Sequence, residues 1–313
     1  MTGAHIMDSV VYEHLWTTPA ARARFGERGR MQAWLRIVAQ LAGAQADLGL
    51  IPRAAADEIG ATADIDGFDL DAIAAGTRES GHSTLGLIRA WHARLSPAAC
   101  EWIYWGATVQ DVTDTWTGTV MRDVLDDTDA ELERLERALT ALAREHRETV
   151  VLGRTHGQPG LPITFGFKAA VWLAEVRRQR ERLAQARPRV AVGQLAGAVG
   201  TCSFWGEQGL QLQARFCERL GLAAPDVTWL TARDRVAEFL VALAMVTGTL
   251  AKVGREVYTL QRAEIAELAE PTRPSVTRCS ESSGLRLCGI VIEPTSPGRV
   301  GSASSAISAR CSV

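Results

Sequence analysis

Leucines recur at helical spacing through the middle of the chain. From Met121 to Thr149 they fall three, four or seven residues apart, charged residues fill most positions between them, and no Pro or Gly interrupts the run. This spacing predicts an amphipathic helix, and so narrow a seam favours packing against a partner helix over lining a globular pocket. The seam consists of Leu125, Leu132, Leu135, Leu139 and Leu142.

Two further long helices are predicted. One begins after Pro162 and runs to Arg187, since proline is tolerated in the first turn of a helix. The other covers residues 232–269, and its middle, from Phe239 to Val246, is apolar on nearly all sides, which predicts burial among other helices. Strand signals are weak, and the best short β-like run is Val190 to Val192.

The N-terminal third is richer in alanine, and its predicted helices are shorter. Asp and Gly punctuate it between residues 61 and 70, which indicates a turn. We therefore expect an all-α protein with a small N-terminal helical domain over residues 1–105. A central bundle of long helices follows over residues 106–270, and an irregular tail covers residues 271–313.

The tail differs in kind from the rest of the chain. Residues 271–313 contain ten serines, three of the six cysteines and five arginines against two acidic residues, and the helical pattern stops abruptly after Glu270. One interpretation is a flexible serine-rich tail. The other is that this stretch is not the original continuation of the protein.

Composition and charge narrow the possible partners. The 313 residues are 47% hydrophobic, which is ample for a core, and the formal net charge is −2, which gives no reason to expect nucleic acid or an anionic membrane as partner. The sequence predicts no apolar run that reaches the roughly 18 to 20 residues needed to span a bilayer. The N-terminus lacks the pattern of a secretory signal, so a cytoplasmic location is expected.

The cysteines give no sign of a metal or redox site. None of the six forms a close C-x-x-C pair, so the spacing fits neither metal ligands nor a redox motif. Reduced, structural thiols are expected in a cytoplasmic chain, and we expect no metal and no cofactor.

Three polar, glycine-containing segments at helix boundaries carry the candidate chemistry. They are RESGHST at residues 78–84, WGATVQDVTDT at residues 105–115 and GRTHGQ at residues 153–158. Bound anions and catalytic side chains are commonly placed at such boundaries. The segments therefore predict a binding site for a small anion.

The side chains of these segments suit a small dicarboxylate and a proton transfer. Thr108, Gln110 and Thr155 are neutral hydrogen-bonding groups that could bind the substrate, and His82 and His156 carry imidazoles, which exchange protons near neutral pH. Taken singly, each residue also has a plain structural interpretation. A histidine in a loop is most often a surface group, and a threonine before a helix is often only its cap. Spacing alone leaves both interpretations open.

Several segments, in order, resemble the fumarase/aspartase superfamily of elimination lyases. Residues 105–115 resemble its first signature as carboxymuconate cycloisomerases carry it, and GRTHGQPGLPITFG, from Gly153, is similar to the second signature of adenylosuccinate lyases. VGQLAGAVGT from Val192, TARDRVAEF from Thr231 and QRAEIAELAE from Gln261 also match in order. The resemblance spans about residues 10–270, and the ordered set makes it specific.

The resemblance implies a role for each matching residue. Thr108 and Thr155 would bind substrate carboxylates, His156 would be the general acid that assists the leaving group, and His82 would be a second histidine near it. Gln158 and Arg233 would be further polar contacts. The reaction would be the anti elimination of a succinyl-type dicarboxylate to fumarate, without a cofactor, in a homotetramer whose active sites draw on three subunits.

Two departures from the family pattern stand out. Val109 takes the place of the usual serine. The third signature, a mobile loop that supplies the serine base and a lysine, is replaced by PTRPSVTRCSESSGLRLCGIV, in which Ser282 and Ser283 stand without the expected Met-Pro and Lys-x-Asn-Pro. The family's third domain is also absent. A frameshift or truncating rearrangement after Glu270 is the expected cause, and the alternative is a short paralogue whose base is Ser282 or Ser283.

Two rivals to the elimination lyase remain open. A carboxymuconate-type cycloisomerase fits the first signature, although retention of His156 favours elimination over lactonisation. A catalytically inactive helical assembly subunit would keep the bundle without the loop.

Overall fold

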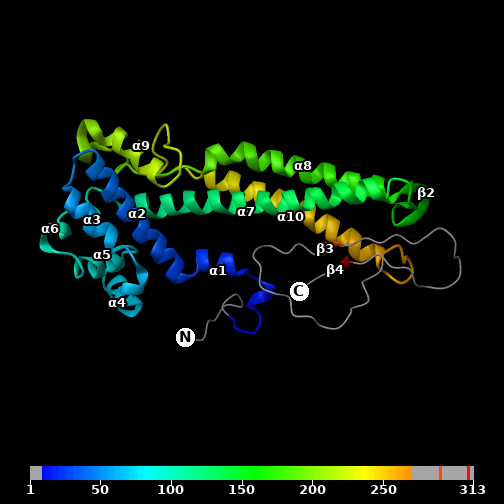
Figure 1. Cartoon of the computed structure of the whole chain (residues 1–313), viewed down its shortest axis with the longest axis horizontal. Helices are drawn as coiled ribbons and strands as arrows, with labels where there is room; N and C mark the ends of the chain where they lie inside the picture. Colours follow the sequence, from blue (N-terminus) through cyan, green and yellow to red (C-terminus); the bar gives the residue numbers. More distant parts are fainter. Residues whose placement is uncertain (1–8, 269–288, 291–308, 311–313) are drawn as a thin grey trace. The chain divides into compact units, whose positions relative to one another are not determined.

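The computed structural model of the chain describes residues 9–268, 289–290 and 309–310 (Figure 1). Helices dominate it, which confirms the all-α prediction, and two small antiparallel sheets are added. One of these sheets pairs β3 (Gly289–Ile290) with β4 (Ala309–Arg310). The predictions about Ser282, Ser283 and the replaced signature loop lie outside the described residues.

The chain divides into two compact units, each assembled from separate stretches of sequence. The bundle unit contains Met1–Ala20, Asp126–Gln185 and Leu240–Val313, and the N-terminal unit contains Ala21–Leu125 and Ala186–Phe239. Three long helices contribute residues to both units: α7 (Val109–Glu145), α8 (Phe165–Val190) and α10 (Asp234–Leu260).

In the bundle unit, parts of these three helices pack through a leucine seam and through cross-helix polar bonds. Leu132, Leu139 and Leu142 of α7 are buried, as predicted. Arg180 of α8 donates hydrogen bonds of 2.8 and 3.1 Å to Asp129 of α7. Further pairs join α8 to α10: Gln179 with Thr249, Lys168 with Glu256, and Lys252 with Glu175.

An antiparallel hairpin joins α7 to α8, where no strand was predicted. It pairs β1 (Val150–Thr155) with β2 (Gln158–Thr164), so α8 begins at Phe165 and not directly after Pro162. The turn residues His156 and Gly157 have φ of 50° and 73°, and two successive left-handed residues match the right-handed twist of a two-residue hairpin. The sequence analysis treated this turn as a loop before a helix and so missed both strands.

The strand-like run at Val190 to Val192 does not form a strand. Val190 is the last residue of α8, and Val192 makes only an isolated parallel bridge with Ala223. The run is too short for a ladder, and the preceding helix absorbs its first residue.

The N-terminal unit is built of short helices around an aromatic core. Asp69 caps α4 by accepting a bond from the Asp71 backbone, and Ser96 caps α6 in the same way from Ala99. The fully buried Trp91 donates a 2.8 Å bond to Thr62. The helical elements that lie wholly in this unit are α2 (Glu27–Asp47), α3 (Arg53–Ala61), η3 (Ile65–Gly67), α4 (Leu70–Ser80), α5 (Leu85–His92), α6 (Pro97–Cys100), η4 (Ser203–Gln208) and α9 (Gly209–Arg219). Before them, η2 (Glu13–Leu15) belongs to the bundle unit, and α1 (Pro19–Phe25) crosses from one unit into the other.

Helix α10 departs from its prediction in length and in burial. It ends at Leu260 and not near residue 269, because the chain folds back and the backbone of Glu267 and Leu268 donates to the Leu260 carbonyl. Val246 is buried as expected, but neighbouring apolar side chains face outward, with Leu240 57% exposed. The apolar stretch is therefore only half covered by its own chain.

By length and composition alone, α10 could also cross a membrane, an apolar run that the sequence analysis did not recognise. Only 28% of the apolar window is buried within the chain. A single helix of this kind is weak evidence for a membrane, since core helices of soluble proteins meet the same criterion.

Candidate active site

The first candidate segment, in the N-terminal unit, forms the start of α7. Thr108 precedes the helix, and its backbone N–H donates a 2.9 Å bond to the Asp111 carboxylate, while the Asp111 N–H donates to the Thr108 carbonyl. This reciprocal arrangement is that of a capping box. The plain interpretation of Thr108 as a cap is therefore correct for its backbone, and its hydroxyl has no hydrogen-bond partner among the described residues.

The same carboxylate holds the glycine-rich stretch against the helix. Asp111 is buried and accepts bonds of 2.9 and 3.1 Å from the backbone of Ala196 and Gly197. Burial raises the pKa of this carboxyl, and the three backbone N–H groups oppose the rise. Asp111 thus fixes the loop before Thr108 and the loop at Ala196 with one side chain.

A second buried contact lies one turn further along α7. The Thr115 hydroxyl bonds both the backbone N–H and the carbonyl of Gln194, at 2.9 and 2.7 Å. The Gln194 side chain in turn donates to Thr228 and accepts from the Trp229 backbone. Thr115 therefore ties three segments of the N-terminal unit together and is not a helix cap.

The third contact is a bidentate ion pair. Both terminal nitrogens of Arg233 donate to the buried Asp114, at 3.0 and 2.9 Å. This pairing raises the pKa of Arg233, and the guanidinium also stacks over the ring of Trp229. Gln110 donates a 2.6 Å bond to the Leu230 carbonyl. Both Gln110 and Arg233 are thus engaged within the protein.

Close packing explains the glycine of this segment. Gly106 has φ of 79°, and a Cβ there would lie 2.3 Å from the Phe204 ring and 2.7 Å from the Trp205 ring. A side chain there would strain the left-handed backbone and would have to displace both rings, which favours glycine.

His82 lies in the same unit, in the short loop between α4 and α5. Its side chain is exposed, and its Nδ1 lies 3.4 Å from the hydroxyl of the buried Thr84. The His82 backbone N–H donates a hydrogen bond to Ser80 Oγ, which also shapes the loop. The imidazole is therefore accessible and weakly held.

The remaining candidates lie at the tip of the β1–β2 hairpin, in the bundle unit. Thr155, His156 and Gln158 are all exposed, and within the described residues their side chains form no hydrogen bond. Arg154 is anchored, because it donates a 2.6 Å bond to Glu267, and this pairing raises its pKa. The base of the hairpin is thus fixed while its tip offers free polar groups.

The structure shows one feature that the sequence analysis passed over. Asp111 and Asp114 are not among the site residues that the sequence predicts, yet with Thr115 and Gln194 they form the buried polar network of the site. Their spacing along α7 was a usable signal, because residues three and four apart share a helix face. Among the described residues, no group of three His, Cys, Asp or Glu side chains could hold a metal ion.

Comparison with known proteins identifies the family. Residues 14–280 match the family described as lyase. The chain belongs to this lyase family. The resemblance to the fumarase/aspartase superfamily is thereby confirmed, since the solved structures that this chain resembles include a fumarate lyase from Mesorhizobium sp. BNC1, with 39% identity, a TM-score of 0.75, and coverage of 80% of this chain and 59% of that one.

Further relatives in the family carry different names. The chain is 38% identical to N-acetyl-S-(2-succino)cysteine lyase of Dickeya dadantii, covering 86% of this chain and 59% of the relative. It is 37% identical to adenylosuccinate lyase of Methanocaldococcus jannaschii, covering 84% and 57%. The structure of 3-carboxy-cis,cis-muconate lactonizing enzyme from Pseudomonas putida matches with a TM-score of 0.81 and 36% identity, over 85% and 61%. The chain spans about three fifths of the length of these relatives.

Proposed function

We propose that the protein catalyses the anti β-elimination of a succinyl-type dicarboxylate to fumarate, with C–N cleavage as in adenylosuccinate lyase. The observation that carries this proposal is the Thr108 hydroxyl at the start of the 37-residue helix α7, which no described residue engages in a hydrogen bond. The N-terminus of a helix favours a carboxylate, and the bonds of Asp111 fix the backbone there before any ligand arrives. A pre-organised carboxylate site is what stabilisation of the doubly charged intermediate requires.

The names of two relatives support the substrate class. A succinylated cysteine and adenylosuccinate both carry a succinyl group, whose two carboxylates match a site with two anion-binding segments. In this proposal, different subunits contribute Thr108 and Thr155, which bind the carboxylates. The serine at the position of the third signature, Ser282 or Ser283, takes the proton beside a carboxylate, His156 protonates the leaving group, and His82 assists it. Gln158 is a further polar contact.

Gln110 and Arg233 are less free to contact the substrate than the other candidate residues. Both are bonded to protein groups, so direct contact with the substrate by either side chain requires those bonds to exchange. The Arg233 charge is matched by Asp114. The net attraction for a dicarboxylate therefore rests on the helix start and the hydroxyls more than on this arginine.

A variant of His156 tests the proposed role. With a succinylated amine as substrate and ultraviolet absorbance of fumarate as the readout, His156→Ala should abolish turnover, because the leaving group loses its acid. The matched control is His92→Ala, which removes an exposed histidine from α5. Turnover of His156→Ala within about tenfold of the parent, roughly 1.4 kcal/mol, would contradict the assignment.

A cycloisomerase is the second candidate, favoured by the similarity to the lactonizing enzyme of Pseudomonas putida. The same assay separates the two, since a carboxymuconate substrate would give a lactone and no fumarate. Absence of both activities from folded protein would favour the third candidate, an inactive helical assembly subunit.

We further propose that the protein is a homotetramer formed through the bundle unit. Exposed apolar side chains gather along α8 and α10, including Phe167, Val171, Leu240, Val241 and Met245. Large apolar side chains exposed on two paired helices support contacts with other subunits along the bundle. In light scattering, Met245→Glu should lower the mass of the assembly, and a parent protein that is a stable monomer would contradict the proposal.

The division into domains at residues 105 and 270, the cytoplasmic location, and the lack of nucleic-acid or membrane partners stay predictions. Fractionation of cells that express the tagged chain tests the location directly.

A further inference from the structure

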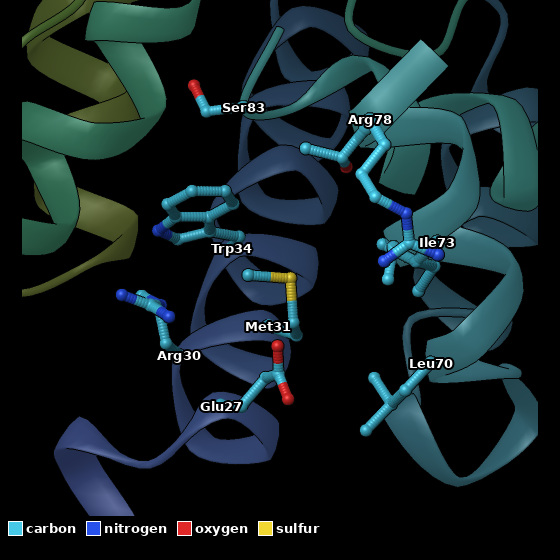
Figure 2. Close-up of a pocket in the computed structure, with 10 residues that line it drawn as sticks. Glu27, Arg30, Met31, Trp34, Leu70, Ile73, Arg78 and Ser83 are labelled. Carbon is cyan, nitrogen blue, oxygen red and sulfur yellow. The ribbon is translucent and has the colours of Figure 1, made fainter. Parts of the chain in front are cut away.

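A cavity of about 390 Å³ lies in the N-terminal unit, between α2 and α4. Figure 2 shows Arg30 and Trp34 extending from α2, with Leu70, Ile73 and Arg78 across from them. Met31, Leu70 and Ile73 give the cavity an apolar wall. Its volume falls in the range of small-molecule sites.

Two residues that line this cavity carry a hydrogen-bond donor with no acceptor among the described residues. Trp34 is only 7% exposed, and its indole N–H makes no hydrogen bond. The Nε–H of Arg30, one helical turn earlier, is also buried without a partner. Buried donors are nearly always paired in folded proteins, because the loss of water is otherwise uncompensated. Two orphan donors in one cavity therefore indicate an acceptor that the described chain does not supply.

The charges of the cavity indicate what the acceptor is. Arg30 and Arg78 are positive, Glu27 is negative, and no ion pair within the described chain engages any of the three. The hydroxyls of Thr77 and Ser83 add further donors. Donors thus outnumber acceptors, and the excess charge is positive, which favours an anion next to an apolar wall.

We propose that this cavity binds a small organic anion, with a carboxylate or phosphate held by Arg30 and Trp34 and an apolar body against Met31, Leu70 and Ile73. None of Thr108, Thr155 and His156 lines it. Arg78 and Ser83 belong to the 78–84 segment that also carries His82, but His82 itself does not line the cavity. Because the binding is measured without turnover, it can hold or fail independently of the proposed elimination.

Three matched probes separate the anion from its apolar body. Benzoate and phenyl phosphate carry the ring with an oxyanion, and phenol carries the ring without one. In titration calorimetry on the purified chain, benzoate or phenyl phosphate should bind at least about tenfold more tightly than phenol, as a charge-assisted hydrogen bond provides. The tighter of the two anions identifies the preferred group. Equal binding of phenol, or no binding of either anion, would overturn the proposal.

Variants locate the binding. Trp34→Phe keeps the ring and removes only the N–H, and Arg30→Gln removes the charge, so each should weaken anion binding, by about threefold and about tenfold respectively. Arg36→Gln, an exposed change on the same helix, is the control and should bind as the parent does. Circular dichroism establishes that each variant is folded. If Arg30→Gln does not fold, Trp34→Phe alone decides, and unchanged affinity of a folded Trp34→Phe variant would place the anion elsewhere and refute the site.

Discussion

The start of α7 and the tip of the β1–β2 hairpin carry similar residues but are built in opposite ways. Both are polar, glycine-containing segments with a threonine that is proposed to hold a carboxylate. At the start of α7, Asp111, Asp114 and Thr115 are buried and bonded to three other segments of their unit. At the hairpin tip, Thr155 and His156 are exposed and without side-chain partners among the described residues.

The start of α7 is held in place before any ligand binds, whereas the hairpin tip has polar groups that are free to bind one. The α7 segment is fixed by its own chain, so binding there costs little ordering. The hairpin tip exposes hydrogen-bonding groups that only water, ligand or another chain can satisfy. Substitutions should therefore damage stability at the first region and chemistry at the second.

The largest effect is expected at Asp111. In Asp111→Asn, the amide nitrogen must face one of the backbone N–H donors that now point at the carboxylate, so a buried donor loses its acceptor. We expect unfolding free energy to fall by about 2–4 kcal/mol, measured by urea denaturation. Asp123→Asn, a partly exposed change on the same helix, should cost well under 1 kcal/mol. Equal losses of unfolding free energy in the two variants would contradict the structural role assigned to the Asp111 network.

The next largest loss of stability is expected at Asp47, which belongs to an ion cluster in the same unit and not to the polar network of α7. Arg53, Arg215 and Arg219 surround Asp47 and lower its pKa to about 2. A lowered pKa gives stability that is present above the unfolded value near 3.8 and lost as the pH falls through 2. Asp47→Asn should therefore cost about 2 kcal/mol at pH 6 and well under 1 kcal/mol near pH 2.

Urea denaturation of both proteins between pH 6 and pH 2 checks this. Asp57→Asn, an exposed change on α3, serves as the control. A pH-independent loss in Asp47→Asn would show that packing, and not charge, connects α2 to α9.

A smaller effect is expected at Arg233. Lysine keeps the charge beside Asp114 but cannot make the two parallel bonds or stack on Trp229. Arg233→Lys should lower unfolding free energy by about 1 kcal/mol. If Arg233 instead binds substrate directly, the loss will appear in KM with stability unchanged.

The smallest effect is expected at the hairpin and has the opposite sign. His156 has φ of 50°, a left-handed backbone that asparagine adopts more readily than histidine. His156→Asn should raise the thermal midpoint slightly, by about 0.5 kcal/mol of stability, while turnover is lost. Gly157→Ala is the counterpart and should destabilise the turn, because its φ of 73° is strained for alanine. A neutral result at both positions would mean that the hairpin contributes nothing measurable to stability.

The sequence predicted the long helices well because their patterns are long and local. The leucines of α7 recur over several turns, and Leu132 and Leu139 are buried as expected. The hairpin was not predicted because Pro162 suggested a helix start. Two left-handed residues, His156 and Gly157, instead form a tight turn that pairs two strands. The exposed side chains of α10 were not predicted for another reason. A helix that is apolar on all sides is expected to be buried, but its sequence does not show whether its own chain or another subunit covers it.

The candidate site was predictable as a set of residues but not as a set of contacts. Thr108 and His156 follow from short segments of sequence, whereas the pairing of Asp114 with Arg233 joins residues 119 positions apart. No local pattern contains such a contact. Only the three-dimensional structure shows that Gln110 and Arg233 are already hydrogen-bonded to other groups of the protein.

The scarcity of lysine has a practical consequence for chemical labelling. The chain has only Lys168 and Lys252, and both amines are paired with glutamates between α8 and α10. The Lys168 side chain is 15% exposed and that of Lys252 is 50% exposed. An acylating reagent should therefore modify Lys252 first, and attack on Lys168 would report that the two helices have separated. Peptide mass analysis of this pair would thus record the opening of the bundle without an introduced probe.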